Sequence, residues 1–381
     1  MSVLFDYQAF ENQSFGGVSK SYAELIAHLQ SLGVDLHLAI KESDNEHLIQ
    51  TGIAPDVKPK GTANRRWFGG KKWFRGQRRL LRMGLSLAGY RNDFLSINQD
   101  WSIKLLKKGH FDLFEPTFFD AYFLPYLKGK PFVLTVHDMI PEILGVDQPQ
   151  ALQKKLLCPL AAHIHVPSQN TKDDLIRIFD IPPERVTVIP HGAPKAPDNR
   201  YPSPYAFPYL LYVGARWSYK NFVPFLEECA ILIGRHPELH VVCTGTPFTQ
   251  EEIQWIADHG LMSHFEHLRA DERTLQALYQ NAVAFVYPSA YEGFGLPILE
   301  AFVNGCPVAL NKASCFPEVG GDAAVYFDID NRGEMAEVLE PILTGGEGKR
   351  ADMAKKGCQQ ASKFSWEASA TLLKGIYDSL I

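Results

Sequence analysis

Apolar residues recur along the chain with two periods, one typical of helices and one of short buried strands. Tyr22, Leu25, Ile26, Leu29 and Leu32 have the i, i+3, i+4 spacing of an amphipathic helix, which Gly33 is expected to end. Between such helical segments stand short, mostly apolar runs bounded by polar or turn residues. They predict strands at residues 2–6, 34–40, 111–114, 132–136, 163–167 and 186–189.

Strands and helices in alternation are typical of a parallel sheet covered on both faces, so the predicted fold class is α/β, doubly wound. The alternation stops between Pro190 and Pro208, a stretch with six prolines that we interpret as an interdomain linker. A final amphipathic helix is predicted at residues 366–381. The second set of strands is predicted at residues 209–213, 240–244, 284–287, 307–310 and 324–327. The predicted units are a Rossmann-like domain at 1–200, a second at 201–363, and a terminal helical segment at 364–381.

Length and composition agree with two folded domains. The chain has 381 residues, of which 46% are hydrophobic and 21% charged, the composition of a globular rather than a disordered protein. No apolar run approaches the ~20 residues that a membrane-spanning helix needs. The N-terminus has no basic, apolar leader, and the six cysteines include no Cys-x-x-Cys pair. We therefore expect a reducing cytoplasmic location, without a disulfide framework or a zinc knuckle.

Positive charge is concentrated in one segment of an otherwise acidic chain. Residues 58–82 contain ten Lys or Arg and no acid, whereas the rest of the chain carries 28 basic and 43 acidic residues. Aromatic residues interleaved with the cations suit an anionic membrane surface or an anionic acceptor. The side chains expected to make this contact are Arg65, Arg66, Trp67, Lys71, Lys72 and Trp73. A solvated loop is the alternative, and no other feature of the sequence supports nucleic-acid binding.

The densest set of candidate functional residues follows the third predicted strand of the second domain. Gly293 and Gly295 precede a helix expected to start at Leu296, where unobstructed backbone N–H groups would bind an anion. Glu292 and Glu300 flank this start, and carboxylates beside an anion site suit hydrogen bonds to vicinal hydroxyls of a sugar or ribose. The alternative is an ordinary strand–helix turn with a surface Glu at each end.

The first strand of each domain is also followed by candidate residues. In the second domain, Arg216 and Lys220 would supply the cations that a nucleotide diphosphate needs. In the first domain, the backbone amides of Gly16 and Gly17 could approach a phosphate or a sugar. A solvated turn and a plain loop are the alternatives. The sequence lacks G-x-G-x-x-G and G-x-x-x-x-G-K-[ST], which disfavours a dinucleotide oxidoreductase and a P-loop NTPase.

Two further candidates rest on short patterns. His137 closes a predicted strand of the first domain, where it would face the cleft and bond a sugar hydroxyl or the leaving group. A structural histidine is the alternative. Asp328 and Asp330 spell D-x-D, which can hold a divalent metal, but we interpret them as a turn and helix cap and predict no metal site.

Several segments together resemble the family 4 glycosyltransferases, retaining enzymes of the GT-B fold. The strongest is PSAYEGFGLPILEAFVNGCPV, which contains the E-x7-E signature of that family as Glu292 and Glu300. YVGARWSYKN, VPSQNTKDDL, VIPHG, PEVGGDAAVYFD and FSWEASA resemble other landmarks. The resemblance is strongest from residue 209 onward and fails between about 45 and 110. It implies two Rossmann-like domains facing a central cleft, with the C-terminal helix crossing back to the N-terminal domain.

The resemblance also implies which residues meet the donor. Arg216 and Lys220 would neutralise its diphosphate, and Glu300 would hold its ribose. Glu292 would contact hydroxyls of the transferred sugar, which His137 would also approach. The backbone expected at the phosphate and sugar is that of Gly16, Gly17, Gly293, Phe294, Gly295 and Leu296.

In function, the resemblance implies transfer of a hexosyl group, with retention, from a GDP- or UDP-linked donor to a glycan acceptor in surface polysaccharide synthesis, such as that of lipopolysaccharide. The acceptor is expected to be lipid-linked, no cofactor or metal is expected, and the enzyme would work in the cytoplasm or on the inner face of the cytoplasmic membrane. A nucleotide-sugar 2-epimerase of the same fold and a non-catalytic sugar-nucleotide binding protein remain alternatives. Trp217 departs from the family pattern, because a smaller residue is commoner after the arginine.

Overall fold

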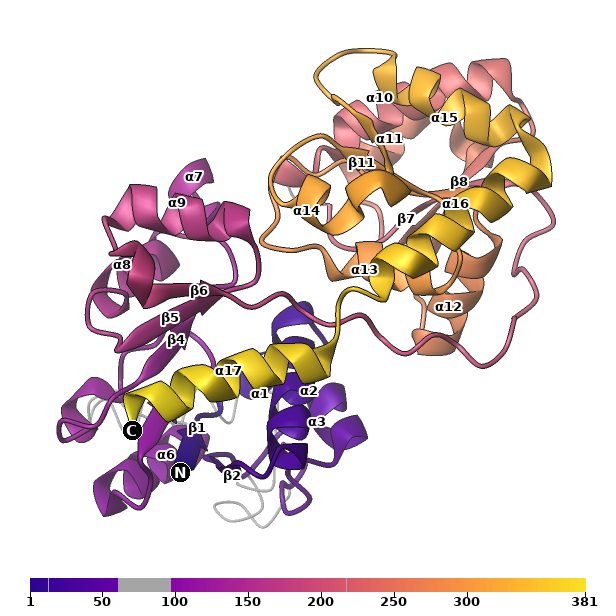
Figure 1. The fold of residues 1–381 in the computed structure, drawn as a ribbon. Coiled ribbons are helices and arrows are strands. Elements are labelled where there is room, and N and C mark those ends of the chain that lie inside the picture. The colour runs from indigo at the N-terminus through magenta and orange to yellow at the C-terminus, as the bar shows by residue number, and fades with distance from the viewer. Residues whose placement is uncertain (13, 61–96, 217) are drawn as a thin grey trace, which may run out of the picture.

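The computed structural model describes residues 1–12, 14–60, 97–216 and 218–381, which form two lobes joined by two chain segments (Figure 1). The N-terminal lobe holds β1 (Ser2–Phe5), α1 (Gln8–Asn12), α2 (Gly17–Ser31), β2 (Asp35–Leu38), α3 (Glu46–Thr51), α6 (Ile97–Lys108), β3 (Leu113–Glu115), β4 (Val133–Thr135), α7 (Ile140–Leu144), α8 (Gln148–Leu157), β5 (His163–Val166), α9 (Gln169–Phe179), β6 (Val186–Val188) and the last helix, α17 (Trp366–Leu380).

The C-terminal lobe holds the elements between the two connecting segments. They are β7 (Tyr209–Tyr212), the short 3-10 helix η3 (Ser218–Lys220), α10 (Phe222–Arg235), β8 (His240–Thr244), α11 (Gln250–Asp258), β9 (Phe265–Leu268), α12 (Glu272–Asn281), β10 (Ala284–Tyr287), α13 (Leu296–Val303), β11 (Val308–Asn311), α14 (Phe316–Gly320), β12 (Val325–Phe327), α15 (Glu334–Thr344) and α16 (Gly346–Ala361).

The N-terminal lobe is built on parallel strands. They form two three-stranded sheets, in the orders β2-β1-β3 and β4-β5-β6. A bridge between Phe114 and Phe132 joins the two edges, so the six strands follow one another as β2-β1-β3-β4-β5-β6. The chain adds β2 on one side of β1 and all later strands on the other side, so the strand order reverses between β1 and β3. The glycine pair that starts α2 follows β1, and His137 follows β4 at the same carboxyl edge.

The C-terminal lobe has a six-stranded parallel sheet in the order β12-β11-β10-β7-β8-β9. The chain runs outward from β7 to β9 and then returns to the other side of β7, where Phe285 of β10 pairs with Leu211. Every residue of β7 and β10 is buried, as expected of apolar runs between two helix layers. Ligands of doubly wound sheets bind where the strand order reverses, so the loops after β7 and β10 are where a site is expected.

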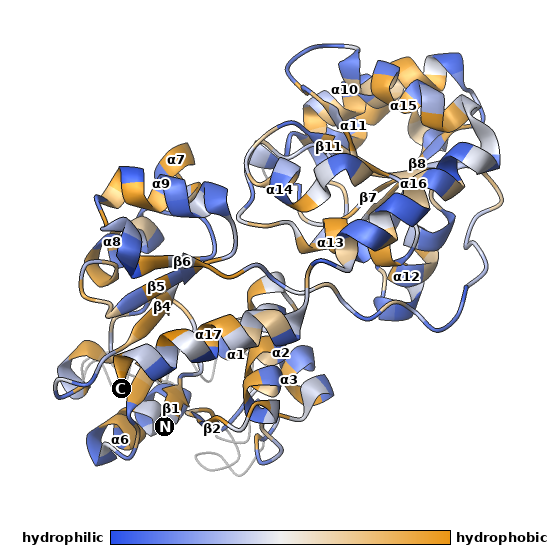
Figure 2. Cartoon of the chain, in the orientation of Figure 1, coloured by the Kyte–Doolittle hydropathy of each residue, from blue (hydrophilic) through white to orange (hydrophobic). Residues whose placement is uncertain are grey.

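Helices cover both faces of the sheets, as the doubly wound class requires, and turn their apolar sides inward (Figure 2). The last helix belongs to the N-terminal core. Ala370, Leu373 and Tyr377 of α17 are at most 1% exposed and pack in one cluster with Phe5 and Tyr22. The predicted return of the C-terminal helix to the N-terminal lobe is therefore confirmed.

The two segments that connect the lobes touch each other. The chain between β6 and β7 forms no helix or strand, and the N–H of Ala193 in it donates to the carbonyl of Phe364 at 3.0 Å. Gly192 packs against Trp366 so closely that a Cβ there would overlap the tryptophan. The domain boundaries at 200/201 and 363/364 stay predictions.

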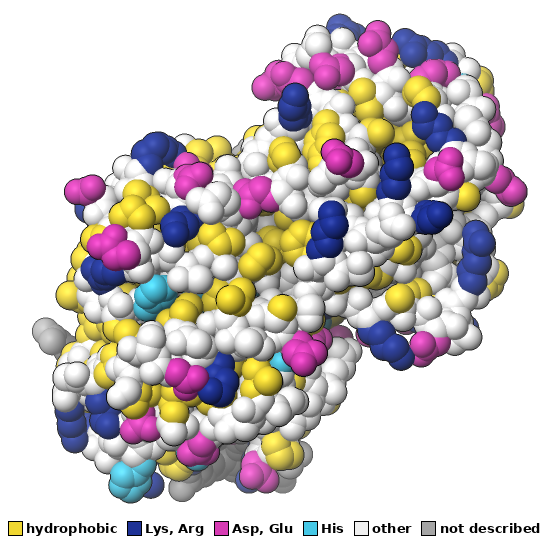
Figure 3. All heavy atoms as spheres, in the orientation of Figure 1, with side chains coloured by type: hydrophobic (Ala, Val, Ile, Leu, Met, Phe, Trp, Pro, Cys, Tyr) yellow, Lys and Arg dark blue, Asp and Glu magenta, His cyan; other side chains and the backbone are white. Residues whose placement is uncertain are grey.

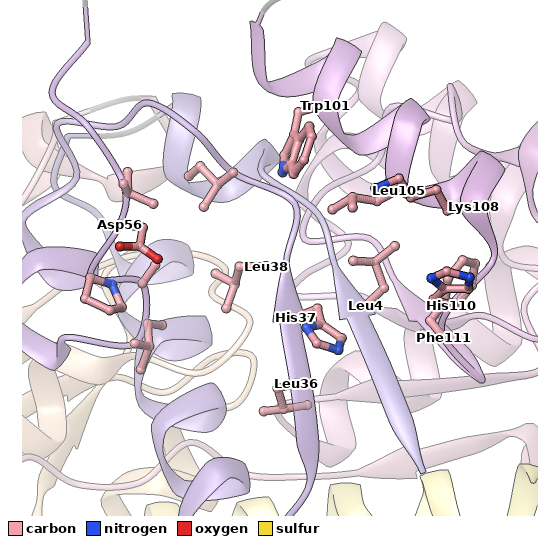
Figure 4. Close-up of a pocket in the computed structure, with 15 residues that line it drawn as sticks. Leu4, Leu36, His37, Leu38, Asp56, Trp101, Leu105, Lys108, His110 and Phe111 are labelled. Carbon is pink, nitrogen blue, oxygen red and sulfur yellow. The ribbon is translucent and has the colours of Figure 1, made fainter.

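A groove of about 440 Å³ lies in the N-terminal lobe beside β2 (Figure 4). Its walls include Leu36, Leu38 and Leu105, and Trp101 and Lys108 reach it from α6. None of the predicted site residues within the described ranges lines it, so it is separate from the site considered below. No helix in those ranges combines the length and hydropathy needed to cross a bilayer. On the face seen in Figure 3, cations and carboxylates are interspersed over both lobes.

Candidate active site

Two loops at the reversal point of the C-terminal sheet hold the predicted diphosphate site. The loop after β7 carries both predicted cations, and the loop after β10 leads into α13. Backbone and side chain tie the loops together: the N–H of Ala290 donates to the carbonyl of Tyr219 at 2.8 Å, and the amide of Asn221 donates to the carbonyl of Pro288 at 3.0 Å. Residues far apart in the sequence are thereby fixed as one rim.

The start of α13 has the features of an anion site. Its N-cap, Gly295, has a φ of 95°, a left-handed conformation that glycine adopts without strain. The hydroxyl of Ser314 donates to the carbonyl of Glu292 at 2.7 Å and holds the preceding loop. Among the described residues, no group accepts from the backbone N–H of Phe294, Gly295 or Leu296. These three donors and the positive end of the helix are therefore available to a ligand.

Lys220 and Glu292 form an ion pair that joins the two loops. The Lys220 ammonium also lies 3.4 Å from the hydroxyl of Tyr287. The side chains of the ion pair are only 13% and 12% exposed, so solvent screens their charges less than at an open surface. The structure thus brings these two predicted residues together.

Arg216 is buried, which differs from the solvated turn that was the alternative to a phosphate-binding role. Its side chain is 2% exposed, and Nε donates to Glu252 at 2.9 Å. Nη2 donates to the carbonyls of Thr246 and Pro247, each at 2.7 Å. Nη1 is buried and has no partner among the described residues, so one donor of this anchored guanidinium remains for a ligand. The assignment of Arg216 to a diphosphate rests on that nitrogen.

The N-terminal lobe meets this rim at its glycine loop and at His137. A Cβ on Gly17 would stand 3.9 Å from Leu296, the first residue of α13. Gly293 touches the backbone of His137 so closely that its own Cβ would overlap the carbonyl oxygen and lie 2.8 Å from the carbonyl carbon. Gly16 is the N-cap of α2, and no side chain caps the start of this helix. Predicted residues from both lobes are therefore adjacent.

His137 has a neutral ring with one free nitrogen. Burial, followed by the nearby His191 and His165, lowers its pKa well below the usual range. Its Nε2 is buried and has no hydrogen-bond partner within the described residues, while the ring packs in a T-shaped arrangement with Tyr22 at a centroid distance of 5.5 Å. An unpartnered nitrogen at the carboxyl edge of the sheet suits a hydroxyl of a bound ligand.

Glu300 is paired across the lobes. Its Oε1 lies 2.6 Å from the ammonium of Lys20, on the first turn of α2, and the two side chains are 18% and 24% exposed. Burial is the largest single effect and lowers the pKa of Lys20, but the charge and hydrogen bond of Glu300, with smaller contributions from Glu272 and Glu24, together outweigh it, and the net shift is upward. The carboxylate predicted to hold a ribose is therefore partnered by a lysine from the opposite lobe.

Several contacts between the lobes were not predicted from the sequence, and two of them involve carboxylates of the C-terminal lobe. One is Lys20 with Glu300; the other is Glu318, whose carboxylate accepts from the backbone N–H of Gln169 at 2.7 Å and Asn170 at 2.8 Å. Glu318 thereby caps α9 of the N-terminal lobe from the C-terminal lobe. The sequence held one clue to the first contact, because Lys20 and Glu300 each lie about one turn after the glycines that start their helices.

The structure describes the D-x-D pattern but not the basic segment. Asp328 and Asp330 are exposed and form the predicted turn, with the N–H of Asp330 donating to Asp328 at 3.0 Å. They do not cap α15, however: its first turn is capped by the carboxylate of Glu228, which accepts from Gly333 and Ala336. The proposed membrane or acceptor residues, Arg65, Arg66, Trp67, Lys71, Lys72 and Trp73, lie outside the described residues, as does Trp217.

Comparison with known proteins agrees with this geometry. The family model Glycosyltransferase Family 4 matches residues 15–195, and the model Glycosyl transferases group 1 matches residues 198–360. O-antigen chain mannosyltransferase B of Escherichia coli is 28% identical over 280 residues, covering 68% of this chain and 73% of that protein. The O-antigen chain mannosyltransferase RfbU of Salmonella typhimurium is 26% identical over 224 residues, covering 58% of this chain and 62% of that protein.

Solved structures share the fold over the full length. A glycosyltransferase from Rickettsia africae has a TM-score of 0.69 and 15% identity over 100% of this chain and 98% of that chain. Anabaena HepE, solved in complex with UDP and glucose, has a TM-score of 0.69 and 18% identity over 99% of both chains. With consecutive family models over nearly the whole length and these two Rossmann-like lobes, the chain belongs to the family 4 glycosyltransferases and has the GT-B fold.

Proposed function

We propose that this glycosyltransferase moves a hexosyl group, with retention, from a GDP- or UDP-linked donor to a glycan acceptor in the cleft between the lobes. The observation that carries the proposal is the rim at β7 and β10. It offers the free N–H groups that start α13, the Lys220 ammonium and the unpartnered Nη1 of Arg216. Donors of this kind suit a diphosphate, and Glu300, one turn into α13, suits the adjoining ribose.

The transfer step needs stabilisation of the leaving diphosphate more than a separate acid and base. Lys220 and the start of α13 would stabilise the leaving oxygen as its negative charge grows in the transition state. That oxygen would accept the proton of the attacking hydroxyl on the same face of the sugar, which gives retention. Glu292 would hold hydroxyls of the transferred sugar, and neutral His137 would bond another through Nε2.

The acceptor is proposed to be a lipid-linked glycan of a surface polysaccharide. The two relatives from Escherichia coli and Salmonella typhimurium are O-antigen mannosyltransferases by name, which supports this class and makes a mannosyl donor the first to test. The test is a thermal-shift panel of GDP- and UDP-linked hexoses, because a ligand that binds the native state raises the unfolding temperature. Transfer from the best donor to glycan acceptors is then followed, with the anomeric configuration read by NMR.

The same experiment separates the alternatives. A donor that stabilises the protein and yields a product of the same anomeric configuration supports the proposal. Epimerisation of the donor without any acceptor would instead identify a 2-epimerase. Binding of a donor with no turnover across the acceptor panel would identify a non-catalytic binding protein.

Glu300→Ala is expected to weaken nucleotide binding by roughly 10–100-fold, because a charge-assisted hydrogen bond to ribose contributes about 1.5–3 kcal/mol. The fold should survive, since the side chains of the Lys20–Glu300 pair remain in part accessible to water. Isothermal titration with nucleoside diphosphates checks this. Glu367→Ala, which removes an exposed carboxylate from α17, is the matched control and should leave the affinity unchanged. Equal affinities of the Glu300 variant and wild type would exclude Glu300 from the donor site.

Activity is expected to survive EDTA, because the cations and helix start at the rim can balance the diphosphate without a divalent metal. Asp328→Asn combined with Asp330→Asn should change activity little, since both side chains are exposed in the turn before α15. Initial rates with and without chelator provide the measurement. Activity that is lost in EDTA and restored by Mn²⁺ or Mg²⁺ would contradict metal independence.

Attachment to an anionic membrane is proposed for the basic segment at residues 58–82, on the charge pattern alone. Wild-type protein should sediment with anionic vesicles at low salt, less so at high salt, and not with neutral vesicles, because salt screens the attraction. Changing Arg65, Arg66, Lys71 and Lys72 to Ser should abolish sedimentation. Binding to neutral vesicles as well, or to none, would favour a soluble acceptor.

A further inference from the structure

Lys20 is a charged group at the candidate site that the proposed function leaves without a task. It belongs to the N-terminal lobe, and its partner Glu300 belongs to the C-terminal lobe, with 2.6 Å between Nζ and Oε1. Glu272 and Glu24 add smaller attractions to its charge, and the pKa of nearby His47 is lowered by burial and then by Lys20. Lys20 is therefore charged at neutral pH, beside a neutral imidazole.

The ion pair leaves part of Glu300 open to a ligand. Lys20 is hydrogen-bonded to Oε1 alone, so Oε2 can still accept. The hydroxyl of Tyr279 is also near: burial, followed by the charge of Glu300, raises the pKa of that tyrosine well above its usual range. A glutamate held at one oxygen presents the other in a fixed direction, whereas a free glutamate must give up rotamer freedom when it binds.

The two helices that carry the pair meet at their starts. Gly17 begins α2 next to Leu296, which begins α13, and Lys20 and Glu300 lie about one turn further along each helix. The pair can form only while the lobes are in contact, because its partners come from different lobes. Orientation of Glu300 thus depends on the approach of the N-terminal lobe.

We propose that Lys20 is a positioning residue for the donor: it orients Glu300 across the lobe interface so that the carboxylate can hold the ribose hydroxyls. This inference rests on the proposed role of Glu300. Lys20 acts through Glu300 and stabilises a geometry that binding requires. An ion pair exposed to this degree contributes little as a tether between lobes, so orientation is the larger expected effect.

The test uses Lys20→Met, which keeps the aliphatic chain and removes the charge, and Lys20→Arg, which keeps the charge. Titration with GDP and UDP, and with the 2′,3′-dideoxy form of each, measures how strongly the ribose hydroxyls are recognised. Freeing one side chain should cost up to about tenfold in affinity. Lys20→Met should therefore weaken the ribonucleotide about tenfold and the dideoxynucleotide much less, and Lys20→Arg should restore most of the loss. In turnover, the donor KM should rise more than kcat falls.

Glu318→Gln is the matched control, because it weakens another contact between the lobes that does not involve Glu300. It should leave the preference for the ribonucleotide unchanged. Equal losses for both nucleotide forms in Lys20→Met, or a Glu318→Gln variant with the same loss of preference, would overturn the proposal and leave Lys20 as a lobe contact only. Circular dichroism and the unfolding temperature show that each variant is folded.

Glu300→Ala separates failure of this inference from failure of the assignment on which it rests. If Glu300→Ala abolishes the ribose preference and Lys20→Met does not, Lys20 has no positioning role, while the role of Glu300 stands. If Glu300→Ala itself leaves the preference intact, the ribose is held elsewhere, and both the assignment and the inference are overturned.

Discussion

Lys220→Met is expected to lower kcat by roughly 10²–10³-fold, the usual effect of losing one group that stabilises charge in a transition state. The leaving diphosphate gains negative charge as the glycosidic bond breaks, so the ammonium contributes more to the transition state than to the bound donor. The variant should also bind the nucleoside diphosphate much more weakly than wild type, but bind the nucleoside almost as well. Steady-state kinetics and titrations with both ligands measure these effects.

Two controls separate charge from packing in this experiment. Lys220→Arg keeps a cation beside Glu292 and should retain more activity than Lys220→Met. Lys374→Met removes a lysine of α17 that pairs with Asp378 at 2.6 Å on the surface, and it should be silent. A Lys220→Met variant that loses nucleoside and nucleoside diphosphate affinity equally would show that Lys220 does not act on the phosphates.

Lys220 is a sharper probe than Arg216 because of what each side chain holds in the protein. Arg216 is buried against the rings of Phe222 and Phe248 and neutralises Glu252, which caps α11. Removing it would leave a buried carboxylate without its partner, so stability and activity would fall together. The sequence placed Arg216 after β7 correctly, but its burial depends on side chains from α10 and the loop after β8, which local patterns do not reveal.

Full burial made several of the predicted strands easy to recognise, and the strand that was missed lacks it. β7, β10 and β11 are buried along their whole length, and each is a continuous apolar run except for Asn311 at the end of β11. β9 lies at the edge of the sheet, and only Phe265 of its four residues is fully buried. An edge strand does not need an apolar run, so residues 265–268 carry little signal even though they pair in register with β8.

Some residues of the candidate site lie in one continuous segment, whereas others are brought together from distant parts of the sequence. The glycines and carboxylates around the start of α13 follow from one continuous segment, and the structure keeps them together. The partner of Glu300 is 280 positions away in the sequence and on the other lobe, and Glu318 reaches α9 across 149 positions. Such pairs depend on how the lobes meet, which no periodicity or motif in a single chain encodes.

Gly293→Ala is expected to lower kcat/KM by roughly 100-fold or more while leaving each lobe folded. The new Cβ would overlap the carbonyl oxygen of His137 and come within 2.8 Å of its carbonyl carbon. These are backbone atoms, so they cannot yield as the end of a flexible side chain would, and the lobes must move apart at this point. A misplacement of about 1 Å can cost roughly 100-fold in rate. Separation of the lobes at this point would move His137 away from the loop that precedes α13.

Gly375→Ala is the matched control for this substitution. Gly375 lies inside α17, has no atom within 4 Å of its prospective Cβ, and has an ordinary negative φ. Alanine there should leave kcat/KM unchanged and raise the free energy of unfolding by up to about 1 kcal/mol, because alanine favours a helix interior over glycine. Circular dichroism should be the same for both variants and wild type. Because the two substitutions add the same methyl group, a Gly293→Ala variant as active as Gly375→Ala would show that turnover does not need the close contact of Gly293 with His137.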